Sequence, residues 1–170
     1  MTTKIVPSLP KIKAYIGHIP QRLKNGHFEN PRGRLEILRR IVTQLVREER
    51  VEIKRNRAVE ARPYTERLLQ LSITRGPDDE YTNKMLDWWL MEPHLKGKVF
   101  DELVPRLKDT DEPYTSLYSL PTMHITAYKD KNIQKPKKLS SVSLEINGHP
   151  FPSLQPLEDA RLLLLRENFL

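Results

Sequence analysis

The sequence predicts an α+β fold in which about four helices pack on a small, mostly antiparallel, three-stranded sheet. Apolar residues recur at helical spacing over most of residues 31–104, and they alternate with polar residues around Val51 and Val142. Prolines punctuate these stretches, and 170 residues suffice for one compact domain with extensions. We therefore expect a basic N-terminal arm over residues 1–29, a core domain over 30–148 and a C-terminal extension over 149–170.

The first helix is predicted to begin at Asn30 and Pro31, a capping residue followed by a first-turn proline. Its apolar face consists of Leu35, Leu38, Ile41, Val42, Leu45 and Val46. Its other faces carry Arg32, Arg34, Arg39, Arg40 and Arg47. One helix can therefore serve the core and a charged partner together. The alternative is a solvated face on which the arginines pair with Glu36, Glu48, Glu49 and Glu52.

A short strand over residues 50–55 follows, because Val51 and Ile53 alternate with charged residues. A second helix is expected from about residue 56 toward residue 73. Pro63 lies inside this stretch and either kinks the helix or marks a new start.

Two more helices are predicted in the middle of the chain. The third follows an acidic turn after Gly76, since acidic residues are favourable at a helix N-terminus. It contains Trp88 and Trp89, which we expect to be one core and one boundary residue rather than a base-stacking platform. The fourth opens at Pro93 and closes at Pro105.

The last third of the chain favours strands. Residues 114–120 and 142–146 are expected to pair beside the first strand, and residues 123–128 form another possible strand. Residues 129–138 contain five lysines and are interpreted as an exposed, mobile insertion. A short helix over 157–169 is expected to dock on the body or on a neighbour.

The charge is divided unevenly along the chain. The net charge is +7, yet residues 1–77 hold 17 lysines and arginines against 7 acidic residues, whereas residues 78–170 hold 12 against 15. An anionic partner, nucleic acid before lipid, should therefore lie against the first half. The first 30 residues contain five basic residues and one acid, Glu29, which is typical of an organelle transit peptide.

Several classes of chemistry find no support. The chain has no cysteine, which excludes disulfides and thiolate zinc sites, and no apolar run approaches the ~20 residues of a membrane span. The five histidines are scattered, and no glycine-rich nucleotide loop occurs. Asp109, Asp111 and Glu112 are interpreted as a solvated turn rather than a cation site. We expect no metal, no cofactor and no small-molecule substrate.

Four fragments, taken in order, carry a resemblance to a known family. Leu45, Val46, Arg47, Glu49 and Arg50 match a Leu-Val-Arg-His-Glu-Arg signature, with Ala58 and Glu60 where its next helix begins. Lys98, Val99, Phe100, Leu103, Pro105 and Arg106, continuing into Lys108 and Asp109, match a second motif, and Tyr114 and Thr115 match Gly-Tyr-Thr-Arg. From Gly33 to about Gly148 the chain thus resembles the seventeenth protein of the bacterial-type large ribosomal subunit, especially its mitochondrial members. Glu48, Glu112, Pro113 and Ser116 depart from the pattern.

The resemblance implies a structural protein without catalytic activity. It would lie on large-subunit ribosomal RNA (rRNA) near the exit side of the particle, beside other ribosomal proteins, in the mitochondrial matrix. Together with the basic pattern, it gives these candidate RNA contacts: Arg22, Lys24, His27, Arg32, Arg34, Arg39, Arg40, Arg47, Arg62, Arg106, Lys108 and Tyr114.

Two alternatives stay open at this point. The first is an RNA-binding factor that visits the particle only during assembly. The second is a small hydrolase using His94 with Asp87 or Glu92, which requires a polar pocket around His94.

Overall fold

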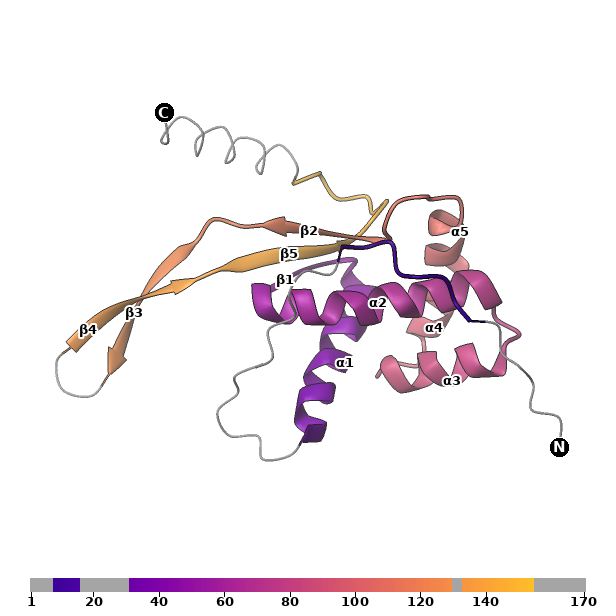
Figure 1. Ribbon diagram of the computed structural model, residues 1–170, viewed down its shortest axis with the longest axis horizontal. Coiled ribbons are helices and arrows are strands. Elements are labelled where there is room, and N and C mark those ends of the chain that lie inside the picture. Colours follow the sequence, from indigo (N-terminus) through magenta and orange to yellow (C-terminus); the bar gives the residue numbers. More distant parts are fainter. Residues whose placement is uncertain (1–7, 16–30, 130–132, 155–170) are drawn as a thin grey trace.

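The computed structural model describes residues 8–15, 31–129 and 133–154, and it confirms the α+β class (Figure 1). The predicted three-stranded antiparallel sheet is present, in the order β1-β5-β2. Its strands are β1 (Arg50–Lys54), β5 (Ser141–Ile146) and β2 (Thr115–Ser119). The predicted helix over residues 157–169 lies outside the described residues.

Helices lie against one side of this sheet. They are α1 (Pro31–Glu48), α2 (Arg55–Arg75), α3 (Glu80–Trp89) and a helical stretch made of α4 (Leu95–Lys98), η1 (Val99–Leu103) and α5 (Val104–Leu107). α2 contacts all three strands, while α1 contacts α2, α3, α4, β1 and β5. The apolar face predicted for the first helix is largely confirmed, since Leu38, Ile41, Val42, Leu45 and Val46 are buried, whereas Leu35 is exposed. The core forms where this face meets Leu144 and Ile146 of β5.

Both prolines that were expected to interrupt helices lie inside them. α2 runs through Pro63 as one helix, so the new start considered there is wrong. Pro63 removes one helical hydrogen bond, and packing of the buried residues around it outweighs that loss. The fourth helix does not close at Pro105 but continues to Leu107. Pro105 stands in the first turn of α5, directly after the π-helical turn η1, where a missing N–H is tolerated.

The structure adds a strand that was not predicted within residues 129–138. Residues 133–139 form a regular strand, β4 (Ile133–Leu139), which pairs antiparallel with β3 (Met123–Lys129). The sequence predicted β3 but not β4, because lysine has a low strand propensity and pairing context overrides it. β3 and β4 continue the β2 and β5 pair, and in Figure 1 they form a twisted ribbon extending away from the helices.

The central strand β5 is buried on both faces. Val142, Leu144 and Ile146 face the helices, and Glu145 lies on the other face, 3% exposed. Glu145 forms an ion pair with Arg50, whose Nε lies 2.7 Å from one carboxylate oxygen. The other oxygen lies 2.8 Å from His149 Nε2. Arg50 also donates to the carbonyl of Pro152. These contacts fasten residues 149–152 across the outer face of the sheet.

Part of the N-terminal arm packs on the body, which was not predicted. Residues 8–15 are extended, as expected, and run along α2 (Figure 1). The carbonyl of Pro10 accepts hydrogen bonds from Arg67 Nη1 and Gln70 Nε2, each 3.1 Å long, and Ala14 is buried. This segment therefore forms part of the described body of the protein rather than a separate arm.

Candidate nucleic-acid interface

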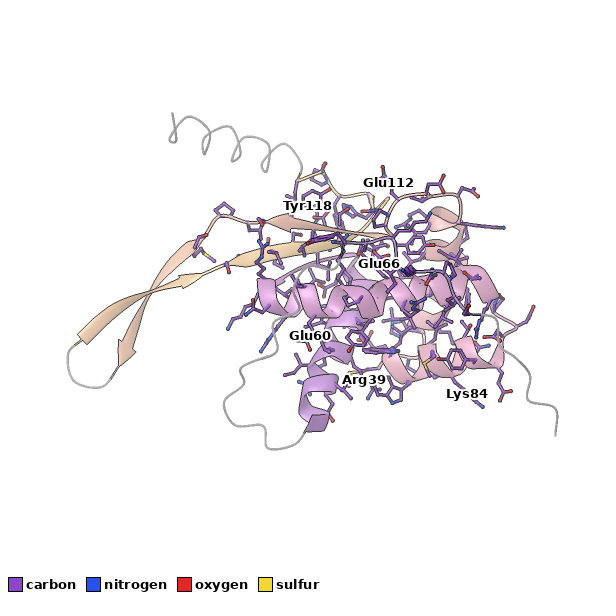
Figure 2. The ribbon with its side chains drawn as sticks, in the orientation of Figure 1. Arg39, Glu60, Glu66, Lys84, Glu112 and Tyr118 are labelled. Carbon is purple, nitrogen blue, oxygen red and sulfur yellow. The ribbon has the colours of Figure 1, made fainter. Side chains whose placement is uncertain are left out.

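Arg39 and Arg40 form the middle of the basic side of α1. Arg40 is exposed, and Arg39 is half-buried against α3. In Figure 2, Arg39 lies on the opposite side of the molecule from Glu112 and Tyr118. Within the described residues, no recorded hydrogen bond or ion pair uses either guanidinium group. Two permanently charged groups thus stand on one helix without a carboxylate partner there.

Among the described residues, Arg39 contacts an aromatic ring instead of a carboxylate. Its guanidinium carbon lies 4.9 Å from the ring centroid of Trp88, a cation–π geometry. Its Nε is buried, and none of the residues with described positions offers it a hydrogen-bond acceptor. A buried donor of this kind is costly unless an acceptor meets it. Arg39 is therefore held in place by a ring while its hydrogen-bonding capacity stays available.

Arg47, at the end of α1, is in a different situation. Its Nη1 donates to Glu92 at 2.7 Å and its Nη2 to Glu48 at 3.1 Å. The side-chain hydrogen bond with Glu48, aided by the charge of Glu92, raises the pKa of Arg47 above its ordinary value. The solvated, carboxylate-paired alternative thus describes Arg47 but not Arg39 or Arg40.

Arg62 is directed into the fold. Its Nε donates to the Thr115 hydroxyl at 3.1 Å, and its Nη2 donates to the Thr115 carbonyl at 2.7 Å. Burial lowers the pKa of Arg62, and the charge of Glu66 offsets part of that effect. Because these donors hold the start of β2, Arg62 is engaged inside the fold rather than presented to a partner.

Arg106 and Lys98 meet at a buried carboxylate. Arg106 Nη1 and Lys98 Nζ both bind Glu49, the latter at 3.0 Å, and Glu49 has a φ of 63°, in the left-handed region. Burial alone would raise the pKa of Glu49, but the hydrogen bonds from Arg106 and Lys98 outweigh it and hold the pKa below its ordinary value of 4.5. Arg106 is thus committed to the junction between α1 and β1.

The remaining candidates lie apart. Lys108 is exposed just after α5, whereas Tyr114 is half-buried and its ring packs against the core. Arg32 and Arg34 lie in the first turns of α1, and Arg22, Lys24 and His27 lie outside the described residues. Sequence reasoning did not single out Lys54, which the structure leaves exposed at the end of β1. The alternation of apolar and charged residues along β1 already placed Lys54 on the polar side of the strand, and this pattern could have predicted its exposure.

The residues of the hydrolase alternative lie on the surface. The His94 side chain is 72% exposed and 3.5 Å from Glu92, whose other oxygen binds Arg47. Asp87 pairs with Lys96 at 3.1 Å. Among the residues with described positions, no group of three or more potential metal ligands gathers, and no helix is long and apolar enough to cross a membrane. Nothing in this geometry desolvates or orients His94 for acid–base work.

Fold and surface together define a small basic α+β protein with an arginine-bearing helix beside its core. A family model described as Ribosomal protein L17 matches residues 37–134, more than half of the chain, and the chain belongs to that family. It is 30% identical over 87 residues to the large ribosomal subunit protein bL17 of the bacterium Caldanaerobacter subterraneus subsp. tengcongensis, covering 51% of this chain and 75% of the relative. The family predicted from the sequence motifs is confirmed, over a narrower range than residues 33–148, while the similarity to mitochondrial members stays a prediction. Ribosomal proteins are structural, which supports the expectation that the chain is not an enzyme.

Proposed function

We propose that the protein is a structural constituent of the large ribosomal subunit and binds its rRNA through the exposed arginines of α1. The observation that carries the proposal is the state of Arg39 and Arg40, whose guanidinium groups have no acidic partner among the described residues. Guanidinium binds phosphate through two hydrogen bonds, so such groups suit the positioning of an RNA backbone. Arg32 and Arg34 extend the same helix toward its start.

Recognition is proposed to depend on RNA shape rather than on sequence. Side chains read the deep, narrow major groove of A-form RNA poorly, so phosphates and unpaired nucleotides are the accessible features. Lys108, exposed just after α5, lies apart from these arginines and is not part of the proposed contact. Arg47, Arg62 and Arg106 support the surface indirectly, since each is bonded to groups of this chain.

We place the protein in mitochondria as part of the same proposal. Two features support this location: the acid-poor first 30 residues, and the Lys108–Asp109 continuation that resembles mitochondrial relatives. The test is sedimentation of a tagged copy from fractionated organelles. It should travel with the mitochondrial large subunit, and a copy found only with cytosolic or bacterial-type ribosomes would contradict the location.

Residence on the particle separates this proposal from the assembly-factor alternative. A structural constituent should stay on large subunits in one copy after a salt wash, because many phosphate contacts act together. A factor that visits during assembly should be lost in the wash and be found on immature particles. A charge-reversed Arg39→Glu/Arg40→Glu protein is expected to fail to join the subunit.

Arg40→Gln should weaken RNA binding and reduce its salt dependence. Each lost phosphate contact lowers the slope of log affinity against log salt by about 0.7 to 0.9. The matched control is Lys84→Gln, which removes the same charge from an exposed residue of α3 that is already paired with Glu80 at 2.6 Å. Affinity for large-subunit rRNA is measured over a salt series. Equal slopes for both variants would argue against α1 as the RNA-facing helix.

A further inference from the structure

Three aromatic rings lie side by side near the α1 arginines, with the half-buried Trp89 between the exposed rings of Tyr64 and Trp88. Tyr64 of α2 lies 4.8 Å from Trp89 of α3, and Trp88 meets Trp89 edge-on at 4.9 Å. Trp89 is half-buried and packs against the α1 and α2 cluster, whereas Trp88 is 43% exposed. Trp89 packs against the hydrophobic core, as expected for one of the two tryptophans, and Trp88 is the exposed member of the pair. Trp88 is an outer ring supported from behind by an anchored one.

The arrangement around Trp88 is positively charged. The guanidinium of Arg39 lies over its ring, and exposed Arg40 follows on the same helix. The attraction between a cation and an aromatic ring becomes stronger when water is excluded from it. The contact between Arg39 and Trp88 therefore persists when a ligand covers both side chains. Arg39 also retains a buried Nε that lacks an acceptor among the described residues.

The chemistry of this surface selects its ligand. An apolar protein partner covering Trp88 would have to desolvate two guanidinium groups without neutralising them, which is costly. An unpaired nucleotide supplies both complements at once, because its base has a π face and its phosphates accept from guanidinium. Sequence-specific RNA recognition uses such unstacked bases, often on aromatic side chains.

We propose that Trp88 stacks an unpaired base of the RNA while Arg39 and Arg40 bind the adjoining phosphates. This inference rests on the proposed function and makes it specific. It assigns the aromatic residue that holds one splayed-out nucleotide, in addition to the contacts with the backbone.

The test compares Trp88→Ala and Arg40→Gln in binding to large-subunit rRNA across a salt series. Loss of a stacked base should lower affinity on the order of tenfold while the salt slope stays that of the wild type, because no phosphate contact is removed. Arg40→Gln should lower the slope. Trp88→Phe should retain most of the affinity, since a smaller ring still stacks, and this variant keeps the test valid if Trp88→Ala folds poorly.

Tryptophan fluorescence gives a second, independent readout. The chain has two tryptophans, so Trp88→Phe leaves Trp89 alone. RNA should quench the wild-type emission through stacking on Trp88, and this quenching should be lost in Trp88→Phe although RNA still binds. The matched control is Tyr81→Ala, which removes another exposed aromatic of α3 that also carries an arginine, Arg75, at 5.2 Å. It should bind RNA as the wild type does.

The outcomes separate the two proposals. If Trp88→Ala binds normally while Arg40→Gln is weakened, stacking is overturned and the proposed function stands. If Trp88→Ala lowers the salt slope as Arg40→Gln does, Trp88 only positions Arg39, and stacking is again overturned. If the wild type self-associates, and Trp88→Ala stops this while RNA binding stays intact, the surface is a protein interface and stacking is overturned. If the wild type binds no large-subunit rRNA, the proposed function fails first.

Discussion

Glu66→Ala is expected to destabilise the protein by about 3 kcal/mol, because it removes the charged acceptor of several buried hydrogen bonds and leaves their donors unsatisfied. Glu66 is 2% exposed and accepts from the backbone N–H of Thr115 at 2.7 Å, from the Thr115 hydroxyl, and from the N–H of Tyr114 at 3.3 Å. The substitution leaves these donors unsatisfied and also removes the charge that partly offsets the effect of burial on Arg62. Urea unfolding measures the loss as a lower midpoint at constant slope.

Two companion variants give this prediction a control. Glu36→Ala removes an exposed glutamate from α1 and should change the free energy of unfolding by no more than about 0.5 kcal/mol. Glu66→Gln keeps an oxygen acceptor but loses the charge, so its loss should be intermediate. A Glu66→Ala protein as stable as Glu36→Ala would show that the start of β2 is held by other contacts.

Glu49→Gln should destabilise the protein by roughly 3 kcal/mol at neutral pH, because two charge-assisted hydrogen bonds lose their acceptor charge. The pKa of Glu49 is lower in the folded protein than its ordinary value of 4.5. Its contribution is therefore complete above that value and disappears as the pH falls through the lowered folded pKa. The stability difference between wild type and Glu49→Gln should shrink over this acidic range.

The measurement is urea unfolding of both proteins at neutral pH and at successive values below 4.5. Glutamine has the same backbone preferences as glutamate, so the φ of 63° costs both proteins alike and cancels. Glu52→Gln, an exposed position on neighbouring β1, serves as the control and should give no pH-dependent difference. A wild-type advantage that persists unchanged at low pH would refute the role assigned to the ionised carboxylate.

Local patterns predicted the elements of the fold well, because each pattern lies within one stretch of sequence. The apolar spacing of α1, the alternation in β1 and β5 and the acidic turn before α3 all led to the observed elements. β4 was missed, since a run of lysines forms a strand here only through its pairing with β3. A distant partner, not a local preference, decides such a segment.

The candidate site was predicted less completely for the same reason. The sequence placed arginines on α1 but could not tell which would be bonded inside the molecule. Arg62 reaches Thr115, 53 residues away, and Arg106 reaches Glu49, 57 residues away. Glu49 was grouped with solvated glutamates on the helix face, whereas it is buried. Only the tertiary fold distinguishes Arg39 and Arg40 from these engaged arginines.

The ribbon of β3 and β4 extends the sheet far from the helices (Figure 1). The two segments that form β2 and β5 continue into β3 and β4. At the transition the backbone N–H of Leu120 donates a hydrogen bond to the Ser141 carbonyl at 3.1 Å. A strand of seven residues spans roughly 23 Å at ~3.3 Å per residue. The ribbon therefore extends the described part of the protein well beyond the helical body that carries the arginines.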